Sequence, residues 1–403
     1  MMRYRLAAAL LATVGLLVLV SSPASARAHV VIHSENSASQ SSGPFTLYKL
    51  GSNRSARSMT EGPDGAVWFT MNGHDRAFIG RVTTSGRLNV YHSTSPFFGP
   101  TSITTGSDGA MWFTTSQAVQ IGSNICSGRF AIGRITTQGR MTFYTDPRVR
   151  FPGDIFAGPD GALWFLNGCS GVPLSLERMT TSGVVTNSFS LAGVPGFISG
   201  ITAGPDGAMW FSDMGYWQGS GPSSILVGQA IGRITTSGSI TMYPETTGLV
   251  VPNEGPFAIT AGPDGALWFA NQGGACQPAG QGEYCLSATS IGRITTSGVF
   301  TTPYYPANGY NFGKATGPEA MTAGPDNSVW FANFGLNPSI GQITTSGTIT
   351  VYSMTGVSGG PESITTGSDG ALWFIDSSVP ENSLGIPIKG KRATNSIGRL
   401  APP

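Results

Sequence analysis

The sequence predicts an all-β protein: a seven-bladed β-propeller of four-stranded antiparallel blades, whose last blade is closed by a strand from the N-terminus. Three observations predict this fold. A tryptophan motif occurs seven times, a second motif follows each copy, and the last copy lacks a strand that reappears near the start of the chain. Repeats of roughly 40 to 50 residues that contain four short strands each are typical of propellers.

The first motif reads Asp-Gly-Ala-Leu-Trp-Phe between Asp264 and Phe269. Its apolar residues alternate with period two, which favours a strand over a helix. Copies of the motif contain seven of the eight tryptophans, spaced 43 to 62 residues apart: Trp68, Trp112, Trp164, Trp210, Trp268, Trp330 and Trp373. We expect these tryptophans to pack between blades.

The second motif reads Ile-Gly-Arg-Ile-Thr-Thr-Ser-Gly from Ile291, and its arginine should pair with the turn aspartate or with backbone carbonyls. Gly-Pro-Asp-Gly and Thr-Ser-Gly segments suit tight turns. One repeat therefore contains four strands, A to D, which we place at Phe257–Ala261, Ala266–Ala270, Ser290–Thr295 and Val299–Thr302.

The two ends of the chain complement each other. The last repeat stops after strand C, at Ser396–Leu400, without a strand D. Near the start, Phe45-Thr46-Leu47-Tyr48 resembles Ile349-Thr350-Val351-Tyr352, a strand D. The N-terminal strand should complete blade seven, which leaves the ring without an exposed inner edge.

The first residues differ in composition from the rest. Two arginines precede an apolar run from Leu6 to Val20, and Ala24-Ser25-Ala26 follows as a cleavage site. This pattern predicts a signal peptide over residues 1–26, and the run is too short for a comfortable membrane span. We expect a flexible leader over 27–44, the propeller over 45–403, and a secreted protein, extracellular or periplasmic, with no membrane span.

Charge limits the partners. Charged residues make up 11% of the chain and the net charge is +1. This argues against nucleic acid, because phosphate binding needs many lysines and arginines. We expect a monomer whose partner is a small molecule, peptide or glycan.

The four cysteines, Cys126, Cys169, Cys276 and Cys285, all fall between strands B and C. An even number in an exported protein suggests disulfides, for which we predict the pairs Cys276–Cys285 and Cys126–Cys169. Metal binding is the alternative, but no Cys-x-x-Cys spacing supports it.

Loop lengths indicate which face carries the function. The segment from the motif tryptophan to the start of strand C varies from 10 to 24 residues, whereas the A–B and C–D turns are short and nearly constant. B–C and D–A connections share one face, and insertions in repeat proteins usually mark the binding face.

Two positions in each blade should line the central opening on that face. Seven residues before the turn aspartate stand Arg57, Thr101, Gly153, Ser199, Phe257, Glu319 and Glu362. Seven residues after it stand Met71, Thr115, Asn167, Asp213, Asn271, Asn333 and Asp376.

These positions supply the candidate site residues. Glu319, Glu362 and Asp376 form an acidic cluster that could hold Mg²⁺ or Ca²⁺ through oxygen ligands. The candidate ligand-binding residues are Arg57, Asp213, Asn271, Asn333, and two loop aromatics that could stack on a ligand, Trp217 and Tyr305. The alternatives are a hydrated rim with a satisfied ion pair, and aromatics that cover the propeller edge.

The repeat Gly-Pro-Asp-Gly-Ala-Leu-Trp-Phe followed by Ile-Gly-Arg-Ile-Thr-Thr-Ser-Gly resembles that of the virginiamycin B (streptogramin) lyases, over Phe45 to Leu400. The resemblance implies a lyase that opens a cyclic depsipeptide by elimination at an ester, with a magnesium ion and a cluster of histidine and glutamate. A family blade reads Trp-Phe-Thr-Glu, but the position of that glutamate holds the series Met71 to Asp376 given above, which contains no glutamate.

Elimination also needs a base beside an acidic C–H bond, usually a histidine. Within a B–C loop only His74 is available, next to Asp75, and it is our candidate base; a solvated loop histidine is the alternative. We therefore predict a propeller that binds a small molecule, peptide or glycan on its loop-rich face. The alternatives are an active metal-dependent lyase or hydrolase, and a scaffold for a protein partner.

Overall fold

The computed structural model describes most of the chain, in these segments: residues 24–27, 30–36, 39–51, 54–72, 77–121, 124–168, 174–219, 225–244, 254–273, 277–279, 282–284, 290–301, 303–305, 317–334, 338–354, 357–358, 360–380 and 394–401. The described residues form strands and turns, and include no helix with the length and apolar character that a membrane crossing requires.

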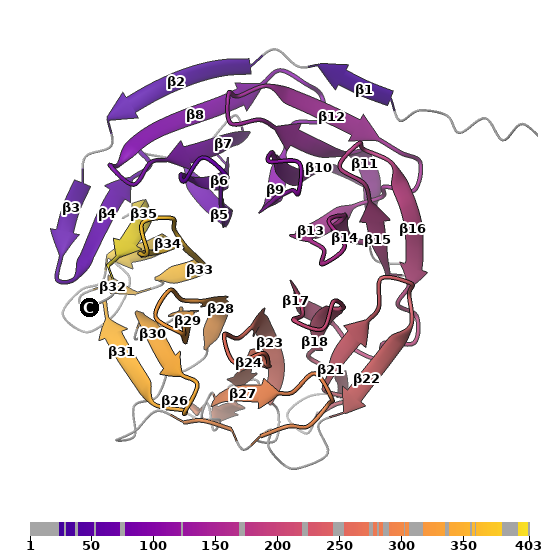
Figure 1. Cartoon of the computed structure of the whole chain (residues 1–403), viewed down its shortest axis with the longest axis vertical. Helices are drawn as coiled ribbons and strands as arrows, with labels where there is room; N and C mark the ends of the chain where they lie inside the picture. The colour runs from indigo at the N-terminus through magenta and orange to yellow at the C-terminus, as the bar shows by residue number, and fades with distance from the viewer. Residues whose placement is uncertain are drawn as a thin grey trace, which may run out of the picture.

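Seven antiparallel sheets stand around a common axis (Figure 1), which confirms the predicted seven-bladed propeller. From the axis outward, blade one contains β5 (Ser55–Glu61), β6 (Val67–Asn72), β7 (Ala77–Val82) and β8 (Arg87–Ser93); blade two β9 (Pro100–Thr105), β10 (Met111–Ile121), β11 (Asn124–Ile135) and β12 (Met141–Thr145); blade three β13 (Pro152–Ala157), β14 (Leu163–Asn167), β15 (Ser175–Met179) and β16 (Val185–Ser190).

The remaining blades follow the same plan. Blade four contains β17 (Ile198–Ala203), β18 (Met209–Asp213), β21 (Ala230–Ile234) and β22 (Ile240–Pro244); blade five β23 (Glu254–Ala261), β24 (Leu267–Gly273) and β27 (Ser290–Ile294); blade six β28 (Pro318–Ala323), β29 (Ser328–Asn333), β30 (Ser339–Thr344) and β31 (Ile349–Ser353); blade seven β33 (Pro361–Thr366), β34 (Leu372–Pro380), β35 (Thr394–Leu400) and β4 (Phe45–Lys49).

Blade five departs from the predicted four strands. In place of its strand D the structure has two isolated bridges, Ile294 with Phe300 and Ile291 with Tyr304. Pro303 lies in this segment. A proline has no N–H to donate, so it interrupts a ladder of hydrogen bonds.

The N-terminal strand closes the ring as predicted. Strand β4 pairs antiparallel with β35, with Phe45 opposite Leu400 and Lys49 opposite Ser396. Blade seven thus combines both ends of the chain in one sheet.

Most of the predicted leader, residues 27–44, forms strands that pair with the outer edges of blades. Strand β2 (Val30–Asn36) pairs with β8, and β3 (Ser39–Ser42) pairs with β4, as outer fifth strands (Figure 1). The reason is the combination of a β-branched run, Val30-Val31-Ile32, with the open outer edge that each blade offers.

A further strand, β1 (Ala24–Arg27), pairs with β12 and includes the predicted cleavage site. Removal of residues 1–26 would therefore remove most of β1. Residues 1–23 of the predicted signal peptide lie outside the described residues, so export stays a prediction.

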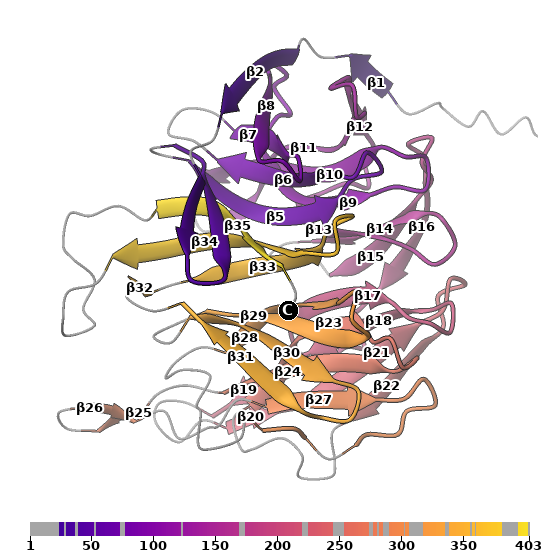
Figure 2. The same ribbon diagram turned by 60° about the vertical axis from the view of Figure 1, so that its left-hand side comes forward.

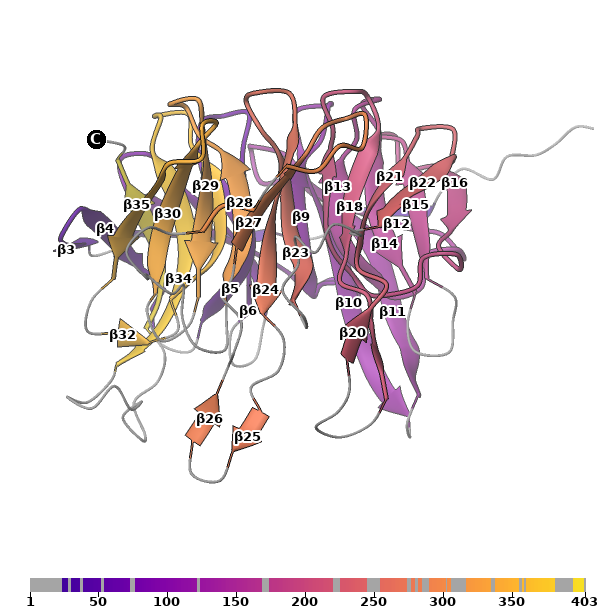
Figure 3. The same ribbon diagram turned by 90° about the horizontal axis from the view of Figure 1, so that it is seen from below.

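The described parts of the long connections lie at one end of the ring, as Figures 2 and 3 show. At this end lie the extensions of β10 and β11 and three small additions: the hairpin of β19 (Tyr216–Gln218) with β20 (Ile225–Val227), the hairpin of β25 (Gln277–Ala279) with β26 (Gly282–Tyr284), and β32 (Val357–Ser358), which pairs with β34. The predicted loop-rich face is therefore confirmed as a structural feature.

The core consists of seven apolar clusters, each between two neighbouring blades. Trp68 of blade one packs in a cluster with Met111 and Phe113 of blade two, and Trp373 of blade seven packs with Val67 and Phe69 of blade one. All seven motif tryptophans are fully buried. The prediction that they pack between blades is confirmed, and the contact of blade seven with blade one makes the ring continuous.

Each tryptophan is held by the same set of contacts, which we call the tryptophan clasp. In blade five, Trp268 donates from Nε1 to Asp264 Oδ1 at 3.0 Å, and Arg293 donates to Asp264 Oδ2 at 2.7 Å. Tyr304 stacks on the Trp268 ring with a centroid distance of 5.4 Å. An arginine makes this ion pair with the turn aspartate in six blades, as predicted, and in blade six Gln342 replaces it with a 2.5 Å bond to Asp326.

We predict that the aspartate contributes more to the clasp than the arginine does. Asp264→Ala removes the acceptor for Trp268, Arg293 and the amide of Ala266, and should lower the free energy of unfolding by about 1–3 kcal/mol. Arg293→Gln should cost no more than about 1 kcal/mol, because exposed ion pairs are weak and Gln342 already occupies this position in blade six. Urea-induced unfolding measures both values; equal losses would contradict the prediction.

Candidate functional site

A β-bulge interrupts the innermost strand of every blade where that strand begins, at the loop-rich end. The register of strand A against strand B shifts between Pro318 and Ala320 in blade six and between Pro361 and Ser363 in blade seven, with equivalent shifts in the other five blades. Bulges redirect side chains and are common beside binding sites.

The residues in these bulges are the first of the two predicted rim positions. Arg57 is exposed, and Thr101, Ser199, Phe257, Glu319 and Glu362 are partly exposed, so this prediction of position is confirmed. The bulge amides are satisfied locally: the Ser58 N–H donates to Thr70 Oγ1 at 3.2 Å and the Ser102 N–H donates to Thr114 Oγ1 at 3.3 Å.

Glu319 and Glu362 form an acid pair across blades six and seven. They stand in equivalent bulges on β28 and β33, which are neighbouring innermost strands. Burial raises the pKa of Glu319 to about 7, and the negative charge of Glu362 adds to the effect. Ser377 donates a hydrogen bond to Glu362 Oε1. Glu319 can therefore take up and release a proton near neutral pH.

Arg57 follows on blade one but does not neutralise the acid pair. Strand β33 contacts β5, so the three residues occupy consecutive blades as predicted. However, none of the ion pairs between described residues includes Arg57, and neither Glu319 nor Glu362 is held by an arginine there. Among the described residues, Arg57 therefore stands beside the acid pair without an ion pair to it.

The second predicted set of rim residues does not face the opening. Asp213, Asn271 and Asn333 are at most 1% exposed, so their side chains are buried below the rim in this structure. Each lies on strand B directly opposite the strand-A residue that precedes the bulge. Asp213 accepts from the Gly196 and Gly215 amides, and Asn271 donates to Ser290, so these side chains hold loop ends.

The structure does not bring the predicted metal ligands together. Asp376 is 2% exposed. It lies on β34, opposite Pro361 of β33, and Pro361 directly precedes the bulge residue Glu362. In the part of the chain that the structure describes, no three His, Cys, Asp or Glu side chains are grouped to hold a metal ion. The carboxyl groups of Glu319 and Glu362 remain at the rim, and two such groups are fewer than a Mg²⁺ or Ca²⁺ site needs from its ligands.

Of the predicted loop residues, the structure describes the two aromatic side chains but not the histidine or most of the cysteines. Trp217 and Tyr305 are 46% exposed, on the β19–β20 hairpin and after the last bridge of blade five, so both are accessible to a ligand. His74, Cys169, Cys276 and Cys285 lie outside the described residues, and Cys126 lies within β11. The predicted base and both disulfides stay predictions.

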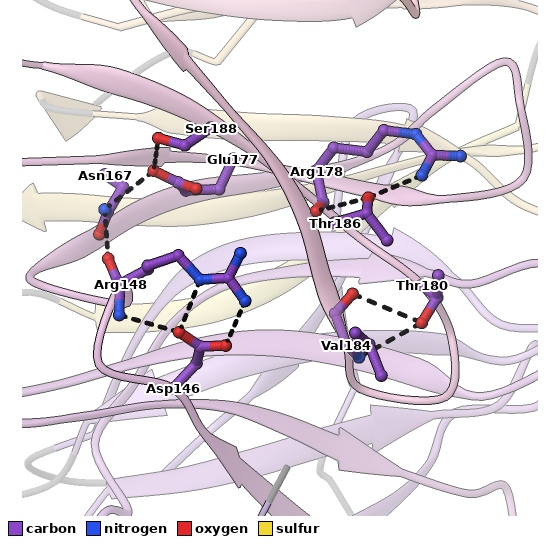
Figure 4. Close-up of polar contacts among 9 residues, drawn as sticks. All are labelled: Asp146, Arg148, Asn167, Glu177, Arg178, Thr180, Val184, Thr186 and Ser188. Atoms are coloured by element: carbon purple, nitrogen blue, oxygen red, sulfur yellow. Dashed lines mark hydrogen bonds and ion pairs between the residues drawn. The ribbon is translucent and has the colours of Figure 1, made fainter. Parts of the chain in front are cut away.

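Blade three contains a polar cluster that the sequence analysis missed. Six blades have a glycine at one position of strand C, because a Cβ atom there would come within about 2 Å of the strand-B phenylalanine ring. Blade three has Glu177 at this position instead. Glu177 is 1% exposed, and its Oε1 accepts from Ser175 at 2.8 Å. The same oxygen accepts from Ser188 at 2.8 Å and from Asn167 at 3.3 Å (Figure 4). The break in the glycine pattern was the available signal.

This cluster fixes the D–A connection between blades two and three. Asn167 donates to the Arg148 carbonyl and accepts from the Arg150 amide, both at 2.8 Å. Phe151, next in the chain, has a φ of 60°, a left-handed conformation that is costly for a bulky residue. Strained backbone of this kind persists only where surrounding contacts enforce it, and it is frequent at functional sites.

Comparison with known proteins identifies the family. The model of the virginiamycin B lyase family matches residues 31–131, 126–244 and 224–385. The chain belongs to the virginiamycin B lyase family. Comparison with curated proteins finds no match.

Solved structures of the family agree with this assignment. The chain is 26% identical to a streptogramin B lyase (TM-score 0.60, covering 91% of this chain and 97% of that one) and 26% identical to virginiamycin B lyase from Staphylococcus aureus (0.61, 93% and 100%). It is 28% identical to a catalytically inactive histidine-to-alanine variant of the S. aureus enzyme with quinupristin (0.62, 89% and 99%).

We predict that Glu319 makes stability depend on pH. Between the ordinary pKa of about 4.5 and the folded value of about 7, the folded chain keeps a proton that the unfolded chain has lost. Raising the pH through this window should therefore lower the free energy of unfolding in the wild type, and less so in Glu319→Gln. Urea unfolding at a series of pH values tests this, and identical pH slopes would refute it.

We also predict that Glu177→Ala lowers the free energy of unfolding by about 2–4 kcal/mol, because Ser175, Ser188 and Asn167 lose a buried acceptor. Glu177→Gln keeps one acceptor oxygen and should cost less. Thermal unfolding of the two variants provides the comparison; an equal cost would show that the side chain acts through volume and not through hydrogen bonds.

Proposed function

We propose that this protein is exported and binds a small molecule, peptide or glycan on its loop-rich face, centred on the acid pair Glu319–Glu362. The observation that carries the proposal is the placement of two carboxyl groups in adjacent bulges on the innermost strands. Repeated residues maintain the blades, whereas these two carboxyl groups occur in only two of seven equivalent positions.

The chemistry of the acid pair favours a particular kind of ligand. With its pKa raised to about 7, Glu319 exchanges its proton near neutral pH, so its own charge there depends on what binds beside it. The two carboxyls can accept hydrogen bonds from an ammonium, amide or hydroxyl group, and a cationic group would lower the pKa of Glu319. Exposed aromatic side chains on the same face, such as Trp217, offer stacking surfaces.

A second candidate function is the lyase activity of the family, with Glu319 as base. In such an elimination the base takes the proton from the carbon beside a carbonyl group, the C–H electrons form a C=C bond, and the ester oxygen leaves as a carboxylate. The near-neutral pKa of Glu319 favours this candidate. Among the histidine side chains that the structure describes, His92 is buried in β8 of blade one, and His74 stays our candidate for a histidine base.

Quinupristin tests the lyase candidate directly. Elimination gives an isomer of unchanged mass, whereas hydrolysis adds one water, so chromatography with mass spectrometry separates the two. We expect an isomeric product that Glu319→Gln reduces by about a hundredfold, since general bases contribute about that much or more. Absence of any product would exclude this candidate for quinupristin, and a product unaffected by Glu319→Gln would place the base elsewhere.

Thermal shifts test the binding proposal independently. A panel of cationic peptides and neutral oligosaccharides should include compounds that raise the melting temperature of the wild type but not of Glu319→Gln or Glu362→Gln. Glu61→Gln is the matched control, because Glu61 ends the innermost strand of blade one at the opposite face. Equal shifts in the wild type and both acid-pair variants would contradict the proposal.

Repeating the melts with EDTA, Mg²⁺ and Ca²⁺ tests the metal prediction.

A further inference from the structure

A second, separate groove opens on the loop-rich face between blades two and three. It has a volume of about 620 Å³, within the range of sites for small organic ligands. Its walls come from three connections: Phe97 between blades one and two, Arg129 and Phe130 on β11, and Asp146, Val149 and Arg150 between blades two and three. The acid pair belongs to blades six and seven, so the two sites lie on different parts of the ring.

The groove is positively charged. The one carboxylate among its lining residues, Asp146, accepts two hydrogen bonds of 2.9 and 2.7 Å from the Arg148 guanidinium (Figure 4). This contact lowers the pKa of Asp146. Arg129 and Arg150 are exposed, and no ion pair between described residues includes either. Arg150 uses only its Nε, toward the Pro147 carbonyl at 3.2 Å. Two guanidinium groups therefore remain available to an anion.

The apolar part of the groove is aromatic. Phe130 is half-buried and meets Phe151 edge to face at 5.7 Å, and Phe97 packs against the core cluster of blades one and two. Val149 is 5% exposed and forms part of the apolar lining. Rings fixed by packing lose little entropy when a flat ligand binds between them.

The wall of the groove is held in place before any ligand binds. The Asn167 side chain is hydrogen-bonded to the Arg148 carbonyl and to the Arg150 amide, the residues on either side of Val149. Asn167 also donates to the buried Glu177. The left-handed backbone of Phe151 lies directly after this anchor. A preorganised wall increases affinity by reducing the cost of ordering.

We propose that this groove binds a small organic carboxylate that has an aromatic ring, with the carboxylate at Arg129 and Arg150 and the ring between Phe97 and Phe130. Guanidinium groups match carboxylates in geometry and charge, and the aromatic walls match the ring. The site is distinct from the acid pair, whose negative charge would repel the same ligand.

The test compares N-dansyl-phenylalanine with its amide by fluorescence titration. The two probes share their rings and differ in one negative charge. We expect the carboxylate to bind at least about tenfold more tightly, and the double variant Arg129→Gln/Arg150→Gln to lose about tenfold or more in affinity for it, because hydrogen bonds to charged groups are strong. Arg140→Gln, which removes one positive charge on the opposite face of blade two, should bind as the wild type does.

Three results would overturn the proposal. They are no saturable binding of the carboxylate, equal affinity for the carboxylate and the amide, and unchanged affinity in the double variant with its melting temperature preserved. The variant Glu319→Gln/Glu362→Gln separates the two sites: unchanged affinity for the probe supports a separate groove, and a loss would assign the probe to the acid pair instead.

Discussion

The tryptophan clasp is the contact on which the whole ring depends. A blade cannot bury both faces of its sheet alone, and each tryptophan fills the space between its own blade and the next. The turn aspartate satisfies the indole N–H that burial would otherwise leave without a partner, and a stacked aromatic ring, Tyr304 in blade five, covers the indole face. The tryptophan clasp occurs in all seven blades, and the last one joins blade seven to blade one, so the core is continuous around the ring.

This constraint determines where function can develop. Residues of the clasp occur in every blade and are committed to packing, so variation is confined to bulges and connections at the other end of each strand. Two departures from the repeat stand out there. Blades six and seven have carboxyl groups in their bulges, and blade three replaces a strand-C glycine with Glu177. Both departures lie beside surfaces with unusual charge, one negative and one positive.

Much of the architecture could be predicted from the sequence, because the repeat fixes blade number, strand order and closure through short-range patterns. The bulge position was also predictable, since Glu319 and Glu362 hold the same offset from their turn aspartates. The burial of Asp213 and Asn271 was not, because it depends on connections that fold over the end of strand B. The positive groove combines residues from three connections, and no spacing along the chain reveals such a surface.

Pairing of β4 with β35 also determines the order of folding. Blade seven joins Lys49 to Ser396, so its outer strand stays without its partner until nearly the whole chain has been synthesised. Contacts between residues so distant in sequence form slowly, and unpaired strand edges promote aggregation in the meantime. Closure of the ring is therefore a late step, and removal of β4 would leave β35 as an open edge of blade seven.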